Sequence, residues 1–285
     1  MRLVTRADFD GLVSGALITK MEEIDSYLFV EPKFMQDGAV DIRKGDIIAN
    51  LPYHRNCTLW FDHHISNKSW DYDTSIVLGK GGFRLAPSAA RVVYEYYTTL
   101  FTSQSSESKI QNLKSKIDKI EGLRFLESNR MRFLLQETDK IDAGRLTQED
   151  VLHPAGYVLI SMTTDGKRAE DRPYWLRVIA LLRDASLEKT LQDPEVQRRC
   201  EELLGAQKRL KEILLKRTTL RGNVIFVDLR GIIDIPDGNR FLLYTLFPTG
   251  NISLKIDNDS QRPKDRKSTR LNSSHSRASR MPSSA

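Results

Sequence analysis

Three polar residues, Asp62-His63-His64, follow an apolar run that extends from Cys57 to Phe61. A continuous apolar run of this length is typical of a buried parallel strand. In open α/β sheets, ligands bind beyond the carboxyl ends of the strands, and carboxylate with imidazole suits divalent ions such as Mn, Fe or Zn. The stretch therefore favours a metal site at the mouth of a crevice. The alternative at this stage is a solvated loop with two incidental histidines.

A second acidic group follows the apolar stretch at the amino terminus. Asp8 and Asp10 come directly after the expected strand Met1–Thr5, and apolar residues recur at helical spacing from Leu12 onward. One Asp is enough to cap that helix, whereas two suit a metal loop better. Ser14 lies one turn into the helix, where it either reaches the same crevice or is an ordinary solvated or back-bonded serine.

Three more polar residues are candidates for the same site. Asn50 falls at the carboxyl end of a further expected strand, which Pro52 stops. Asp139 and Asp142 are three residues apart and share one face if the segment is helical. Either acid is a ligand or a surface charge, and by itself the pair favours the surface, where most charged residues lie.

The order of the expected elements indicates an α/β protein with two domains. A helix that is capped by Asp193 and has Pro194 at its first position runs to about Arg217, long enough to bridge two domains. Gly81-Gly82 reads as a loop or turn. Further strands are expected at 26–30, 46–51, 223–229, 240–247 and 251–256, and further helices at 86–97, 108–126 and 174–187.

The positive charge of the chain is concentrated in a C-terminal tail, residues 263–285. The net charge is +6, but the tail holds six Lys/Arg and one acid, so the body is nearly neutral. The body therefore lacks the electrostatic footprint of a protein that binds long nucleic acids. The tail has no apolar periodicity and resembles translated adapter or vector sequence. We expect it to be disordered and exclude it from the fold.

The composition also bears on the compartment. No stretch approaches the ~20 apolar residues of a membrane helix, and the amino terminus has no secretory signal. Cys57 and Cys200 lack the paired spacing of a disulfide framework or a cysteine zinc site. The sequence thus predicts a cytoplasmic protein without a membrane partner. It leaves open whether the protein is a homodimer.

Together these segments resemble the DHH phosphoesterase superfamily and, within it, proteins labelled exopolyphosphatase-like. The resemblance rests on Asp8-Phe9-Asp10-Gly11, Asn50, Asp62-His63-His64-Ile65-Ser66-Asn67 and Thr138-Asp139, and it covers roughly residues 1–257. It implies a parallel-sheet DHH domain (1–190), a linker helix (191–221) and a partial smaller α/β substrate-binding domain (222–262), ahead of the tail.

The resemblance also implies two divalent metal ions, usually manganese. Asp8 and Asp10 would bind one ion each, Asp62 would bridge both, and His63 would be a further ligand. His64 would be a ligand or a phosphate contact, and Asp139 matches the last acid of the family pattern. Further candidate site residues are Asn50, Asp142, Ser14 and Asn67.

Three departures from the family pattern accompany these expectations. Val4 stands where many members have a histidine, and Asn50 stands where they have an acid, which weakens one metal site. The glycine-rich GGGH-type loop that grips substrate is not reached before the tail, so we expect a truncated second domain.

The resemblance implies a metal-dependent phosphohydrolase that cleaves phosphate ester or phosphoanhydride bonds of a small phosphorylated substrate, in the first instance polyphosphate. One alternative is a phosphodiesterase that acts on short oligonucleotides (nano-RNA) or on a cyclic dinucleotide. The expected partner is in each case a small phosphorylated substrate: polyphosphate, a short oligonucleotide or a dinucleotide. An alternative of another class is a catalytically weakened module that binds nucleotide or polyphosphate.

Overall fold

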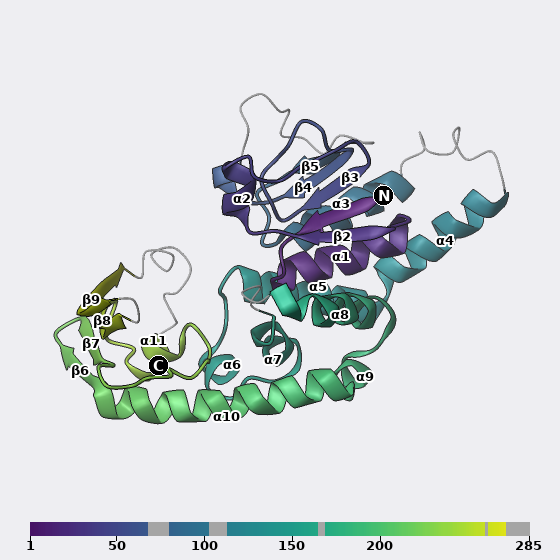
Figure 1. The fold of residues 1–285 in the computed structure, drawn as a ribbon. Helices are drawn as coiled ribbons and strands as arrows, with labels where there is room; N and C mark the ends of the chain where they lie inside the picture. Colours follow the sequence, from purple (N-terminus) through teal and green to yellow (C-terminus); the bar gives the residue numbers. More distant parts are fainter. Residues whose placement is uncertain (68–79, 103–112, 165–168, 260–261, 272–285) are drawn as a thin grey trace. The chain divides into compact units, whose positions relative to one another are not determined.

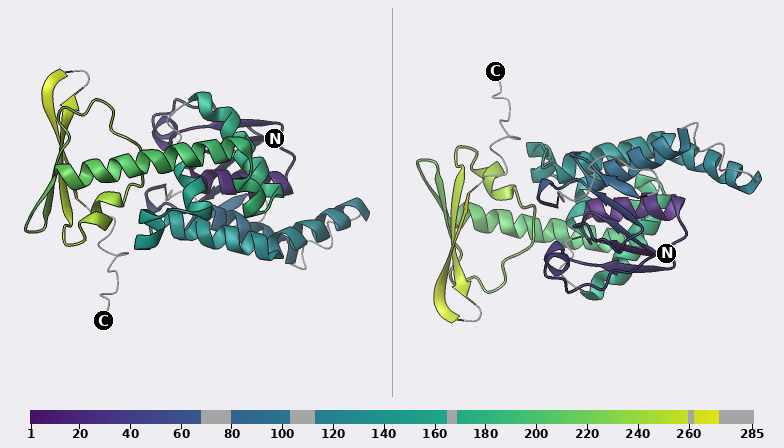
Figure 2. Two further views of the ribbon diagram at one scale, coloured as in Figure 1. Left: turned by 90° about the horizontal axis from the view of Figure 1, so that it is seen from below. Right: turned by 90° about the horizontal axis from the view of Figure 1, so that it is seen from above.

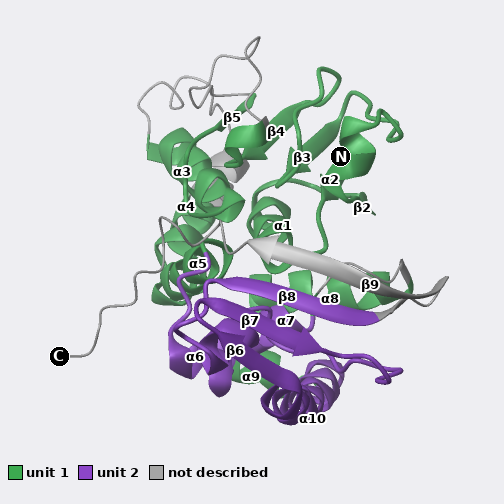
Figure 3. Ribbon diagram, turned by 90° about the vertical axis from the view of Figure 1, so that its left-hand side faces the viewer, with its two compact units in different colours: residues 1–143, 164–193 green, residues 144–163, 194–285 purple. Residues whose placement is uncertain are grey.

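The computed structural model describes residues 1–67, 80–102, 113–164, 169–259 and 262–271 (Figure 1). The chain divides into two compact units. The first comprises residues 1–143 and 164–193, and the second comprises residues 144–163 and 194–285 (Figure 3). Among the described helices, none is both long and apolar enough to cross a membrane.

The first unit is built on a five-stranded parallel sheet with the order β2-β1-β3-β4-β5. This is a doubly wound α/β order, in which ligands gather where the strand order reverses, between β1 and β3. The α/β fold class expected from the sequence is confirmed. The elements are β1 (Arg2–Thr5), α1 (Phe9–Met21), β2 (Ser26–Phe29), α2 (Pro32–Gln36), β3 (Asp46–Ala49), β4 (Leu59–Asp62), a 3-10 turn (Ile65–Asn67), β5 (Gly81–Phe83), α3 (Ala89–Thr102), α4 (Leu113–Glu127), α5 (Asn129–Asp142), a second 3-10 turn (Ala169–Asp171), α8 (Arg172–Asp184) and α9 (Leu187–Leu191).

Side chains pack against both faces of this sheet, which holds its strands in place. Trp60 and Phe61 are fully buried, and successive strand residues point to opposite faces. Phe61 packs edge-to-face on Tyr96 of α3, with ring centroids 5.1 Å apart. Trp60 belongs to a separate cluster with Val4 and Ile48. Side chains at the carboxyl end of β4 are therefore held in a defined position.

The second unit combines a long helix with a four-stranded sheet of order β6-β7-β8-β9 (Figure 2). Strands β7 and β8 are parallel, and the two outer pairs are antiparallel. Its elements are α6 (Gln148–Leu152), α7 (Gly156–Met162), α10 (Pro194–Arg217), β6 (Thr218–Arg221), β7 (Val224–Asp228), α11 (Leu242–Leu246), β8 (Ile252–Asp259) and β9 (Arg262–Leu271).

One expected strand of the second unit is wrong. The segment 240–247 forms helix α11 rather than a strand, because a short apolar run does not by itself distinguish the two. Asn239 turns the chain into this helix: its carbonyl oxygen accepts the Leu242 N–H at 2.9 Å, and its side-chain Oδ1 accepts the Phe241 N–H at 2.9 Å.

Side-chain hydrogen bonds of Gln207 hold the second unit together around α10. Gln207 is buried, and its Nε2 donates to the carbonyl oxygen of Val151 at 3.0 Å. Its Oε1 accepts the Asn239 N–H at 2.9 Å. These bonds tie the α6–α7 segment and the loop before α11 to the long helix, which the sequence predicted as a linker.

The tail expected after residue 262 is described in part. Residues 262–271 form β9, which pairs antiparallel with β8, while 272–285 lie outside the described residues. The domain boundaries expected from the sequence stay a prediction.

Replacing either of two helical glycines by alanine is expected to change the stability of the protein in opposite directions. A Cβ on Gly11 of α1 would lie 2.3 Å from the Arg6 carbonyl oxygen, whereas one on Gly205 of α10 would meet only Arg209 Nη1 at 3.5 Å. We expect Gly11→Ala to destabilise the protein by about 1–3 kcal/mol through overpacking. Gly205→Ala should stabilise it by up to about 1 kcal/mol, because alanine is the better helix former. Chemical denaturation of both variants tests this, and a stabilising Gly11→Ala would contradict the packing described for the β1–α1 loop.

Candidate metal centre

The polar residues predicted from the sequence gather at the carboxyl edge of the parallel sheet. Asp62 is the last residue of β4, Asn50 directly follows β3, and Asp8 lies in the loop after β1. These three strands are neighbours in the sheet. Asp62 and Asn50 are almost completely buried, so they lie in the interior of the first unit rather than in a solvated loop.

Asn50 has an unusual backbone conformation that brings its side chain to Asp8. Its φ is 58°, in the left-handed region, which Asn tolerates better than most residues and which is enriched at functional sites. Its Nδ2 donates to Asp8 Oδ1 at 2.9 Å. Its Oδ1 is buried without a hydrogen-bond partner among the described residues, which leaves this oxygen available to a ligand.

Asp8 is surrounded by donors. Its Oδ1 also accepts the Gly11 N–H at 2.9 Å, which caps the start of α1, and its Oδ2 lies 2.7 Å from Nη1 of Arg6. To bind a metal ion as the family resemblance implies, Asp8 would have to exchange the Arg6 contact for the ion. The assignment of Asp8 as a ligand stays a prediction.

Asp10 caps a different helix from Asp8. Its two carboxylate oxygens accept the N–H groups of Ala89 at 2.8 Å and Ala90 at 2.9 Å, at the start of α3. The side chain is almost fully buried. Burial raises the pKa of Asp10 well above its usual value, and the negative charges of Asp142 and Asp8 raise it further against the opposing effect of the two N–H groups. The neighbourhood of Asp10 thus has an excess of negative charge, which a bound cation would offset.

His63 presents one ring nitrogen to this acidic group. Its Nδ1 lies 3.0 Å from the Ala86 carbonyl oxygen; a carbonyl can only accept, so Nδ1 carries the proton and Nε2 has a lone pair when the ring is neutral. Nε2 lies 3.4 Å from Asp142 Oδ2 and 3.7 Å from Asp10 Oδ2. It is buried and has no hydrogen-bond partner among the described residues. A ring held by its other nitrogen in this way is the usual arrangement of a metal-binding histidine.

His64 is paired with Asp62. Its Nδ1 lies 2.9 Å from Asp62 Oδ1, and this hydrogen bond raises the pKa of His64. The histidine side chain is 37% exposed while that of Asp62 is fully buried. His64 therefore lies at the solvent side of the site, and its raised pKa extends the pH range over which the ring is protonated and can contact an anion.

The ligand atoms fit a divalent ion on chemical grounds. Among the described residues, two groups of potential ligand atoms lie within 4.8 Å of one another: Asp62 with His63 and His64, and Asp10 with His63 and Asp142. His63 belongs to both. An imidazole nitrogen that faces two carboxylates is a set of ligands that suits Mn, Fe or Zn.

The two acids of α5 have different surroundings. Asp139 Oδ2 accepts from Nε of Arg91 at 3.0 Å and from Nη2 of the same residue, while its Oδ1 accepts from Ser88 Oγ at 2.6 Å. Asp142, one turn further, faces His63 instead. In this arrangement Asp142 is placed with the metal group and Asp139 is engaged in an ion pair. The sequence assigned the ligand role to Asp139.

The last two candidate site residues are Ser14 and Asn67. Ser14 is fully buried one turn after Asp10 on α1, and its Oγ has no hydrogen-bond partner in the described part of the chain. Asn67 ends the 3-10 turn after His64, and its side chain lies outside the described residues.

Sequence reasoning missed three residues that hold the site in place. Ser88 and Arg91 fix Asp139, and the Ala86 carbonyl orients His63. Ser88 Oγ also accepts the Arg91 N–H at 3.1 Å, so it caps α3. A serine just before a helix is a sequence signal for such a cap, but its contact with Asp139 joins residues 51 positions apart and leaves no local trace.

A solved structure decides the family. The chain is 32% identical to a pGpG-specific phosphodiesterase, PggH from Vibrio cholerae, over 98% of this chain and 85% of that one, with a TM-score of 0.75. This chain belongs to the DHH phosphoesterase superfamily. RecJ from Thermus thermophilus, in complex with Mn²⁺, is a weak likeness: it is 13% identical over 90% of this chain and 43% of that chain, with a TM-score of 0.44. No family model and no curated protein sequence matches the chain.

The superfamily assignment agrees with the motifs that predicted it, whereas the exopolyphosphatase-like subgroup stays a prediction. PggH is a phosphodiesterase by name, which corresponds to the alternative substrate class weighed from the sequence.

The different surroundings of Asp139 and Asp142 generate a prediction. Asp142→Asn should weaken Mn²⁺ binding by about tenfold or more, because it removes a carboxylate that faces His63. Asp139→Asn should weaken Mn²⁺ binding less and lower the thermal stability more, because it disrupts the ion pair with Arg91. Isothermal titration calorimetry and thermal unfolding of both variants measure the two effects. The reverse order of Mn²⁺ affinities would return the ligand role to Asp139.

Proposed function

We propose that this protein is a divalent-metal-dependent phosphodiesterase that hydrolyses a short linear dinucleotide such as pGpG. The observation that carries the proposal is the cluster of Asp10, Asp62, His63 and Asp142 at the carboxyl edge of the sheet. The substrate class is supported by the 32% identity to PggH across nearly the whole chain.

Two ions, expected to be manganese, would be held by this cluster. Nε2 of His63 offers one lone pair and would bind one ion, together with Asp10 and Asp142, while Asp62 would contribute to holding the other. When bound, such ions lower the pKa of water and stabilise the charge on a leaving oxygen.

The residues of the chain have separate tasks in this proposal. The Ala86 carbonyl keeps the lone pair of His63 on Nε2, so the ring can bind without giving up a proton. The N–H groups of Ala89 and Ala90 hold Asp10 in one orientation. His64 is partly exposed beside Asp62, whose hydrogen bond raises the pKa of the ring. In its protonated form it would contact the phosphate and supply the proton that the leaving oxygen gains when its P–O bond breaks.

Two other functions would use the same cluster of residues. The exopolyphosphatase-like activity expected from the sequence would use the same cluster on a phosphoanhydride bond. A nucleotide- or polyphosphate-binding module would bind its ligand without turnover, and the substitution of Asn50 for the acid of the family pattern is the feature that favours it.

A substrate panel tests the proposal. Purified protein with Mn²⁺ should convert pGpG to GMP at a rate well above that for polyphosphate or a cyclic dinucleotide, and a chelator should abolish the reaction. Asp62→Asn should reduce kcat by about a hundredfold or more, because the loss of a group that stabilises transition-state charge costs about that much. Phosphate release from polyphosphate alone would favour the exopolyphosphatase-like function. Tight binding of pGpG without turnover would favour the binding module.

A further inference from the structure

A large cavity lies beside the edge strand of the first unit. It has a volume of about 960 Å³ and is lined by residues of β2, α2 and α8, by Arg2 of β1, by Ala7 in the loop after β1, and by residues 30–31 and 39–41. Strand β2 is at the end of the sheet order and pairs with β1 alone among the described strands. The volume falls in the range of pockets that enclose a ligand of nucleotide size.

Aromatic side chains supply much of the lining. Phe29 and Trp175 meet edge-to-face with ring centroids 5.0 Å apart, and Phe34 and Tyr27 also line the cavity. Phe34 is 56% exposed, so its ring is available to a ligand. Aromatic faces of this kind are the usual platforms on which nucleobases stack.

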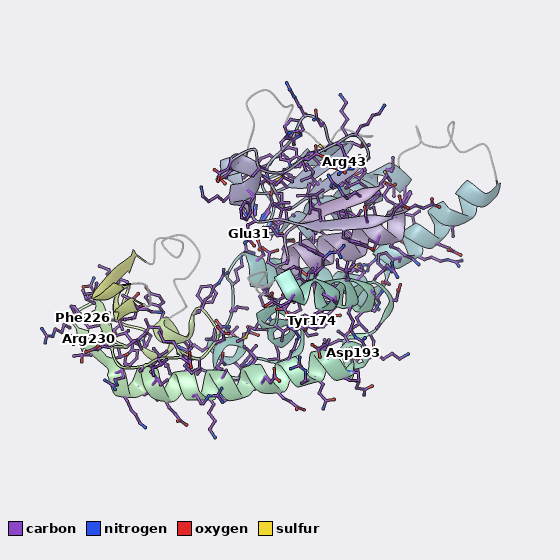
Figure 4. All side chains as sticks on the ribbon, in the orientation of Figure 1. Glu31, Arg43, Tyr174, Asp193, Phe226 and Arg230 are labelled. Carbon is purple, nitrogen blue, oxygen red and sulfur yellow. The ribbon has the colours of Figure 1, made fainter. Side chains whose placement is uncertain are left out.

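Ion pairs of Arg6 link the cavity to the loop after β1, which carries Asp8. Glu31, which lines the cavity, lies between β2 and α2 (Figure 4). Nη2 of Arg6 is 3.5 Å from Glu31 Oε2, and Nη1 of the same Arg6 is 2.7 Å from Asp8 Oδ2. One guanidinium therefore spans from Glu31 at the cavity to Asp8, which directly precedes α1 and Asp10. A dinucleotide with its phosphodiester at the metal centre could place a base in this cavity.

Glu31 has the chemistry to distinguish between bases. It occupies the position before α2, but its side chain makes no capping hydrogen bond, and it is 44% exposed. A carboxylate accepts two parallel N–H donors well. Guanine presents such a pair, N1–H and N2–H, on its Watson–Crick edge, whereas adenine does not.

We propose that this cavity is the nucleobase subsite of the protein and that Glu31 selects guanine. The proposal rests on the proposed dinucleotide phosphodiesterase function. It adds a binding site for the nucleobase, the part of the substrate that the metal centre does not contact. Phe34 supplies the stacking surface, and Arg6 links Glu31 to Asp8 in the loop after β1.

An added β-strand is the competing occupant of a free sheet edge. Nη2 of Arg172 donates to the Tyr27 carbonyl oxygen at 3.4 Å, so part of the edge of β2 is already used by a side chain. The lining also holds Asp41, which lies 3.5 Å from Arg43 Nη2 and is 84% exposed, whereas Glu31 is less exposed and contacts Arg6. The aromatic lining and the carboxylate of Glu31 suit a planar base with a donor edge better than an extended peptide.

Steady-state kinetics with pGpG and pApA test the subsite. Glu31→Gln should reduce the ratio of kcat/KM for pGpG over pApA by about tenfold, the range for loss of a two-donor base contact. Phe34→Ala should raise KM for both dinucleotides by about tenfold, because stacking does not depend on the base. Lys33→Gln is the matched control, because Lys33 lies on α2 with Phe34, is 81% exposed and does not line the cavity. The ratio of kcat/KM for pGpG over pApA in this variant should equal that of the wild type.

The outcomes separate this proposal from the function on which it rests. If Glu31→Gln lowers kcat/KM equally for pGpG and pApA, Glu31 only holds Arg6 in place. If Glu31→Gln leaves both kcat/KM values unchanged, guanine binds elsewhere. Either result overturns the proposed subsite. If the wild type turns over neither dinucleotide, the phosphodiesterase function fails. Calorimetry with GMP and AMP still decides the subsite in that case: preferential GMP binding that Glu31→Gln removes supports it, and equal binding of the two nucleotides overturns it.

Discussion

The buried carboxylate of Asp10 is the constraint on which the site depends. Burial disfavours its charge, and the nearby acids Asp142 and Asp8 disfavour it further. The two N–H groups at the start of α3 oppose this effect and fix the carboxylate in one orientation. A buried negative charge with acidic neighbours is costly unless a cation or a proton accompanies it. A functional role for the cluster accounts for this arrangement, because a carboxylate with a purely structural role would gain nothing from acidic neighbours.

The sheet explains why the cluster forms at this edge. Strands β1, β3 and β4 run parallel and side by side, so the residues that follow them meet at one edge although they are far apart in the sequence. Helix α5 then adds Asp142 from the side, and the loop before α3 adds the Ala86 carbonyl that orients His63. Each contribution comes from an element whose position is fixed by a buried core, as preorganised sites require.

The sequence predicted the strand ends well because their signal is local: an apolar run followed by polar residues. It missed β5 because Gly81-Gly82 has no strand preference. Gly81 has a φ of 82°, and a Cβ there would lie 2.1 Å from the Trp60 carbonyl oxygen, so the requirement for glycine comes from the neighbouring strand. It also did not separate Asp139 from Asp142. Both lie on one helix, and only their distant partners, Arg91 and His63, distinguish them.

The central claim is that the carboxyl edge of the parallel sheet binds divalent metal through Asp10, Asp62, His63 and Asp142. Anomalous diffraction from crystals grown with Mn²⁺, measured at the manganese absorption edge, tests it most directly. The account predicts at least one anomalous peak at bonding distance from His63 Nε2 and from carboxylate oxygens of this group. An absence of manganese at this edge, or a peak only at another place in the protein, would contradict the account.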